Sequence, residues 1–174
     1  TSIGQKEIDE TPCTTRAEGD HVYTSRFMNG IEPPPFWKMA LKMNDLPTDQ
    51  PVDRWQICHF APPSHVFIEV GVALLGEGGK DAPEHKKAAT TVVDFITPET
   101  ETSMWYFWGM ARRFKPRDEA LTAQIREGQG RIFAEDQQML EEQQLNLLKY
   151  PARKLLALNI DAGGVSARRV IDRL

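Results

Sequence analysis

Asp136 is the residue whose position most clearly suggests chemistry, because it interrupts an apolar stripe in the second half of the chain. Apolar residues recur there at three- to four-residue steps, the spacing of one face of a helix, and the stripe runs from Ile132 through Asp136 to Leu140. Burying an unpaired carboxylate costs on the order of several kcal/mol. We therefore expect Asp136 to have a cation, hydrogen-bond donors or a metal ion as its partner. The alternative is an Asp at the edge of the stripe, either partly exposed or paired with an Arg of the sheet.

Two acidic residues of the first half are candidates for a pocket wall beside Asp136. Glu69 lies in a predicted strand over residues 66–75, and Asp94 lies in a predicted strand over residues 89–97. If the faces that carry them look at the long helix, both acids enter one pocket. A solvent-facing position is the alternative for each. An acid-lined pocket disfavours a carboxylated substrate unless the acids are protonated or paired.

The helix itself offers two more candidates, Glu127 and Gln129, which precede Asp136 by about two turns. Exposure to solvent is the alternative for both. Gly128 and Gly130 lie beside them, and each glycine costs roughly 1 kcal/mol relative to alanine in a helix. The pair predicts either a kink with a close approach by another group, or a plain break between two helices.

The four histidines, His21, His59, His65 and His85, show no pair at ligand spacing on one helix face. His59 and His65 flank two prolines and are expected on adjacent strands. A mononuclear iron site of the facial type needs two His and one carboxylate. No histidine pairs with Asp136 by spacing, so structural or surface roles are predicted for all four. Phosphate-loop, dinucleotide and nucleophile-elbow patterns are absent from the sequence.

The order of the predicted elements indicates an α+β fold. Apolar and aromatic runs predict strands over 21–28, 54–60, 66–75, 89–97 and 102–112. From residue 116 the period becomes helical, ends at Tyr150-Pro151, and returns in a terminal helix over 165–174. Residues 1–19 and 38–52 are expected to be irregular, and the proline run over 32–37 stiff and non-helical. Strands followed by helices favour an antiparallel sheet around a long helix.

Composition excludes several classes of function. The chain has 174 residues and a net charge of −4, with 26% charged residues. It therefore has no basic surplus for nucleic acid. No run of 18 apolar residues predicts a membrane span, and no signal-peptide pattern opens the chain. Cys13 and Cys58 lack metal-ligand spacing and are expected to be free thiols in the cytoplasm.

Three segments carry a resemblance to a known family. They are Thr97–Thr102 with the aromatic run from Trp105 to Arg112, the stretch from Ile125 to Asp136, and Leu158–Val165 with its Asp-Ala-Gly-Gly turn. On these residues the chain resembles the C-terminal catalytic domain of Rieske non-haem iron oxygenases, and within them the vanillate O-demethylase (vanillate monooxygenase) oxygenase subunits. The resemblance covers essentially the whole chain.

The resemblance implies a helix-grip fold of the START/Bet v 1 type, with a curved antiparallel sheet around a long C-terminal helix, here incomplete. It implies a mononuclear Fe(2+) held by two His and one Asp, with Asp136 at the matching position. It also implies a methoxylated aromatic acid as substrate, oxidative demethylation or hydroxylation, a separate NADH-dependent reductase, and a homotrimer.

Residues 1–174 then correspond to the substrate-pocket domain alone. The family's His-ligand segment precedes the residues matched here, and the Cys and His pairs of its Rieske [2Fe-2S] domain are not in this sequence. The resemblance therefore predicts a chain that is inactive by itself. Two other readings stay open: a metal-free helix-grip domain that binds a small apolar ligand, and an interaction domain that pairs through its aromatic strand at 105–108.

Overall fold

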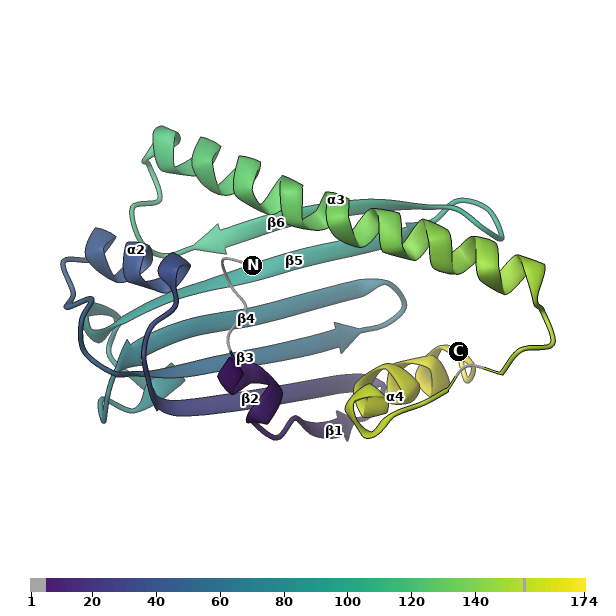
Figure 1. Ribbon diagram of the computed structural model, residues 1–174, viewed down its shortest axis with the longest axis horizontal. Helices are drawn as coiled ribbons and strands as arrows, with labels where there is room; N and C mark the ends of the chain where they lie inside the picture. Colours follow the sequence, from purple (N-terminus) through teal and green to yellow (C-terminus); the bar gives the residue numbers. More distant parts are fainter. Residues whose placement is uncertain (1–5, 155) are drawn as a thin grey trace. The chain divides into compact units, whose positions relative to one another are not determined.

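The computed structural model describes residues 6–154 and 156–174. The chain divides into two compact units, one of residues 1–115 and 157–174 and the other of residues 116–156. The first unit contains the sheet and three short α-helices, and the second contains one long helix (Figure 1).

The sheet has six strands in sequence order, each antiparallel to the next, and it is open at both ends. The strands are β1 (Thr14–Glu18), β2 (His21–Ile31), β3 (Val52–Ala61), β4 (His65–Leu74), β5 (Lys87–Pro98) and β6 (Met104–Arg112). The prediction of five strands is confirmed for β2 to β6. The prediction of an irregular segment over 1–19 is wrong at β1 and at the helix α1 (Lys6–Glu10), while residues 1–5 lie outside the described part.

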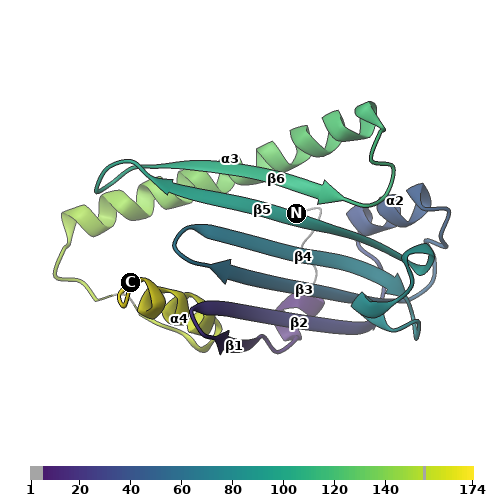
Figure 2. The same cartoon turned by 180° about the vertical axis from the view of Figure 1, so that it is seen from behind.

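The register assigns every strand residue to one of two faces. Thr24, Cys58, Ile68 and Val92 are successive cross-strand partners. They lie on the side against which α1 and α4 (Ala162–Ile171) rest, so we call this side the α4 face (Figure 1). The opposite face is seen in Figure 2. Because side chains alternate along a strand, the partners Tyr23, His59, Phe67 and Val93 belong to the opposite face.

A close approach fixes α4 on the sheet. A Cβ built on Gly163 would lie 2.3 Å from Cγ2 of Thr24, so only a residue without a side chain fits there unchanged. Val170 is buried on the same helix. The terminal helix was predicted from residue 165, after a turn at 161–164. It begins at Ala162 instead, and both glycines of the predicted turn are helical.

Helix α2 (Pro35–Met43) begins inside the proline run, so the predictions of a non-helical segment up to residue 37 and of a loop from residue 38 are wrong there. Pro35 occupies its first turn, where the missing N–H has no helical acceptor to lose and the fixed φ suits a helix start. Trp37, Ala40 and Leu41 are buried on this helix. Burial of the apolar side of α2 therefore stabilises a helix where the local sequence predicts a loop.

The opposite face has its own small core at one end. Trp55 is 1% exposed and packs with Ala73 and Ala82. Ala82 belongs to the loop between β4 and β5, which carries two 3-10 turns, η1 (Gly79–Asp81) and η2 (Glu84–Lys86). The loop therefore covers one end of this face of the sheet.

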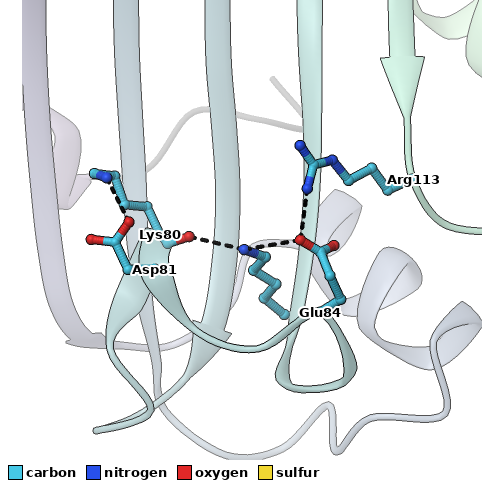
Figure 3. A network of polar contacts seen from close by, with 5 residues as sticks. Lys80, Asp81, Glu84 and Arg113 are labelled. Atoms are coloured by element: carbon cyan, nitrogen blue, oxygen red, sulfur yellow. Dashed lines mark hydrogen bonds and ion pairs between the residues drawn. The ribbon is translucent and has the colours of Figure 1, made fainter.

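Polar contacts hold this loop over Trp55 (Figure 3). Glu84 accepts from Arg113 Nη1 at 2.7 Å and pairs with Lys87 Nζ at 3.2 Å. Lys87 Nζ also donates to the backbone oxygen of Lys80 at 3.0 Å. The exposed Arg113–Glu84 pair contributes at most about 1 kcal/mol, so burial of Trp55 provides more of the stability.

The long helix α3 (Glu119–Lys149) is continuous. Asp118 caps it, with its side chain accepting from Leu121 N at 2.9 Å. Its end before Tyr150-Pro151 is as predicted. The predicted break at Gly128 and Gly130 is wrong, because helical structure runs through both residues.

Among the residues the structure places, none of the helices has the length and apolar character needed for a membrane span.

Candidate functional site

Asp136 lies near the middle of α3, and its side chain is exposed. Of the apolar stripe, only Leu121 and Ile125 are buried in the described chain. The exposed side chain fits the alternative of a carboxylate at the edge of the stripe, and the role of Asp136 as a metal ligand stays a prediction. An exposed carboxylate carries no desolvation penalty and is accessible to a ligand.

The continuity of α3 fixes how the other helix candidates relate to Asp136. Gln129 lies seven residues earlier, which returns it to the same side of the helix about 10 Å away along the axis. Glu127 lies nine residues earlier and points about 180° away from Asp136. Its carboxylate faces Arg131 Nη2 at 3.5 Å. Gln129 and Asp136 therefore share a side of α3, and Glu127 lies on the other side.

Asp94 is a buried carboxyl group on the α4 face of β5, only 3% exposed. Burial raises its pKa, and a hydrogen bond from Tyr106 on β6 opposes that rise. Its Oδ1 has no hydrogen-bond partner in the part of the chain that the structure describes. Asp94 is thus a carboxyl group biased towards its neutral form, with one oxygen left over for a further contact.

Glu69 lies on the other side of the sheet. It is paired with Thr91, whereas Asp94 is paired with Val66, so the register puts the two acids on opposite faces. Glu69 is exposed. The expectation that both acids enter one pocket is wrong, because a difference of one register position moves a side chain to the other face.

Sequence reasoning missed a contact between two histidines. His21 Nδ1 and His59 Nε2 are 2.7 Å apart, although 38 residues separate them in the chain. Burial first, then the charges of His21 and Arg16, lower the pKa of His59. Only the pairing of β2 with β3 brings the two rings together, so no local spacing in the sequence could reveal the contact.

Within 6–154 and 156–174, no three side chains of His, Cys, Asp or Glu come together in a way that could hold a metal ion. Among the described residues, Asp136 therefore has no two further side chains with which to hold a metal ion.

The full length of the chain, residues 1–174, matches the family described as the vanillate O-demethylase oxygenase C-terminal domain. The chain belongs to this family. The vanillate O-demethylase oxygenase subunit of Pseudomonas sp. (strain ATCC 19151) is 68% identical over 174 residues, which are 100% of this chain and 53% of that protein. The corresponding subunit of Pseudomonas sp. (strain HR199 / DSM 7063) is 67% identical over the same 174 residues, 49% of its length. The chain thus spans about half the length of these relatives.

A more distant member of the comparison is the iron-sulfur subunit of a toluene-4-sulfonate monooxygenase system from Comamonas testosteroni. It is 38% identical over 125 residues, 70% of this chain and 35% of that protein. The relatives of this vanillate O-demethylase-type domain are therefore oxygenase components with different aromatic substrates in their names.

Solved structures extend the comparison to the fold. Dicamba monooxygenase bound to 3,6-dichlorosalicylic acid aligns with a TM-score of 0.81 at 22% identity, covering 97% of this chain and 48% of that one. Dicamba monooxygenase with non-heme iron and dicamba aligns with a TM-score of 0.77. The predicted α+β class and helix-grip fold are confirmed.

Proposed function

We propose that this chain is the substrate-pocket part of a Rieske-type aromatic oxygenase that oxidatively demethylates a methoxylated aromatic acid such as vanillate. The observation that carries the proposal is the 68% identity to a vanillate O-demethylase oxygenase subunit across all 174 residues. Identity of that level over a whole domain supports a shared pocket as well as a shared fold. The proposal includes hydroxylation of a related aromatic acid that places a different substituent in the pocket.

The described residues do not by themselves fit a mononuclear iron site, because they bring no three metal-ligating side chains together. We therefore assign Asp136 one carboxylate ligand to Fe(2+), in a site completed by groups outside these 174 residues. Its exposure and its place on the continuous helix α3 support the assignment. The Rieske [2Fe-2S] cluster, by the same proposal, belongs to the half of the relatives that this chain does not cover.

Asp94 and Gln129 are the proposed substrate contacts of this chain. Asp94 offers an unsatisfied Oδ1 and a raised pKa. A raised pKa favours the protonated carboxyl group, which can donate a hydrogen bond to a substrate and repels an anionic substrate less than a carboxylate does. Gln129 is supported by its place on the Asp136 side of α3. Glu69 lies on the other face of the sheet and Glu127 on the other side of α3, so neither is proposed as a substrate contact.

The proposal also includes the partners that a complete enzyme of this kind would use. They are a separate reductase that delivers electrons from NADH, a homotrimeric assembly and a cytoplasmic location. The names of the relatives support the first of these, since they describe oxygenase components of larger systems.

A chimera tests the function directly. The part of the strain ATCC 19151 subunit that precedes the matched residues is joined to residues 1–174, and the product is assayed with a vanillate O-demethylase reductase. We expect vanillate-dependent NADH oxidation with release of formaldehyde. Asp136→Asn should abolish turnover, and the neighbouring Glu135→Gln should retain it, because Glu135 points about 100° away on the helix.

Either of two results would overturn the proposal. One is a folded chimera, loaded with iron, that turns over an unrelated aromatic sulfonate but not vanillate. The other is full turnover in Asp136→Asn. Tight binding of an apolar aromatic by residues 1–174 alone, with no turnover in the chimera, would point instead to a metal-free binding domain.

A further inference from the structure

Two histidines meet on the face of the sheet opposite to α4. His21 is the first residue of β2, and His59 lies on the neighbouring β3. The Nδ1 atom of His21 is 2.7 Å from the Nε2 atom of His59, with ring centroids 5.0 Å apart. His21 is exposed and His59 partly so, which leaves the pair open to ions from solvent.

The surroundings hold the His59 ring in place. Tyr23, its direct cross-strand partner, stacks on it at 4.2 Å with an interplanar angle of 10°. The ring of Phe67 lies 5.7 Å away on the other neighbouring strand. A ring fixed between two strands loses little conformational entropy when it binds a ligand, so one half of the pair is pre-organised.

The contact also turns the two facing ring nitrogens, His21 Nδ1 and His59 Nε2, towards each other. At 2.7 Å one imidazole nitrogen must donate and the other accept, so a nitrogen lone pair points at the shared proton. A metal ion that displaces this proton would lie off the line between the two nitrogens, about 2.0–2.1 Å from each, and accept a lone pair from both after a small rotation of the rings. Metal binding needs neutral imidazole.

We propose that His21 and His59 together bind a divalent transition-metal ion of the Ni²⁺ or Cu²⁺ type, with water completing its coordination. The site uses no residue of the proposed function and does not depend on it. It uses two protein ligands, which agrees with the lack of any three-ligand group in the described part of the chain.

The separation of the two nitrogens selects the kind of ion. With metal–nitrogen distances of about 2.0–2.1 Å, a right-angled site needs its nitrogens about 2.9 Å apart and a tetrahedral site about 3.3 Å. The observed 2.7 Å has to open by roughly 0.2 Å for the first and roughly 0.6 Å for the second. Square-planar and octahedral ions are therefore favoured over tetrahedral Zn²⁺, and Fe²⁺ binds still more weakly.

Calorimetric titration of the untagged, chelator-treated protein with Ni²⁺ tests the site. We expect one Ni²⁺ per chain, with weaker binding of Zn²⁺. Loss of a second-shell partner already lowers metal affinity by about 10–100-fold, so His21→Gln and His59→Gln should each weaken Ni²⁺ binding by at least about tenfold. His65→Gln is the matched control, because His65 lies on the same face of β4 and should leave the affinity unchanged.

An independent measurement avoids the variants altogether. Substoichiometric Ni²⁺, which is paramagnetic when octahedral, should broaden the ring-proton NMR signals of His21 and His59 before those of His65 and His85. The proposal is overturned if the wild-type protein binds no Ni²⁺, if His59→Gln binds it as tightly as wild type, or if the broadening centres on His65 or His85.

Discussion

Asp94 illustrates at the scale of a single residue how a fold sets the protonation state of a carboxyl group. Burial on the α4 face works against its ionised form, and the hydrogen bond from Tyr106 offsets only part of the effect. Its pKa in the folded protein is therefore above the value of about 3.9 expected in the unfolded chain.

This shift predicts a specific dependence of stability on pH. Between the unfolded and the folded pKa of Asp94, the folded state binds more protons, so the free energy of unfolding falls as pH rises through that interval. Asp94→Asn removes this component while keeping a hydrogen-bonding side chain of similar size. We expect the stability difference between Asp94→Asn and wild type to shift in favour of the variant from pH 4 to pH 7, measured by urea unfolding.

Asp81→Asn serves as the control, since the Asp81 side chain is 78% exposed and only pairs with Lys80. Its stability should follow the wild-type curve. Parallel curves for wild type and Asp94→Asn across the pH range would contradict a raised pKa for the buried Asp94.

Gly71 is a second position where one atom decides the outcome. A Cβ at Gly71 would lie 2.2 Å from Cζ2 of Trp55, its buried cross-strand partner. Trp55 is 1% exposed and cannot move aside without disturbing the core under Ala82. Gly71→Ala should lower the free energy of unfolding by about 1–3 kcal/mol or more.

Gly109 is the matched glycine for this experiment. It also lies in a strand of the same sheet, but nothing approaches its built Cβ within 4 Å. Gly109→Ala should be neutral or slightly stabilising in urea unfolding. Equal losses in the two variants would show that backbone freedom, and not the contact with Trp55, explains the need for Gly71.

At this scale the sequence identified candidate residues but not their surroundings. Asp94, Glu69 and Asp136 stand out by residue type, yet their burial and faces depend on strand register and on helix packing. The contact of His21 with His59 arises only when β2 pairs with β3. No local sequence pattern reveals which residues of neighbouring strands will be partners, because strand register is a property of the folded sheet.

At the scale of elements, α4 depends on a pair of adjacent glycines with opposite roles. Gly163 faces Thr24 so closely that an added Cβ would overlap Cγ2, whereas Gly164 has open space around it. Gly163→Ala should therefore destabilise the packing of α4 on β2. Gly164→Ala should stabilise the protein by roughly 0.5–1 kcal/mol, because alanine is the better helix former.

A double variant separates the contact from other effects. Thr24→Ser removes the Cγ2 atom that an added Cβ would meet, so it should recover most of the loss when combined with Gly163→Ala. Urea unfolding of the two single variants and the double variant gives the coupling energy. Strict additivity would contradict a direct clash between Gly163→Ala and Thr24.

The elements that sequence analysis missed lacked the pattern on which it relies. Strand β1 reads Thr-Thr-Arg-Ala-Glu, is mostly exposed at the sheet edge, and so shows no alternation of apolar residues. Helix α2 begins inside a proline run that favours an extended chain, and only its packing reveals it. The long helix and the five other strands were predictable because their periodicity is strong.

At the scale of the whole molecule, the chain spans about half of the relatives that it matches most completely. The central claim, that Asp136 is an iron ligand, therefore has to be tested in a protein that supplies the other half. In the chimera described above, a Rieske cluster contributes two iron ions and a mononuclear site contributes one.

The most direct measurement is the iron content of that chimera by elemental analysis, comparing Asp136→Asn with Glu135→Gln. The account predicts about three iron ions per chain in the parent and in Glu135→Gln, and about two in Asp136→Asn, with the spectrum of the cluster unchanged. Retention of all three in Asp136→Asn would contradict the assignment of Asp136 as an iron ligand.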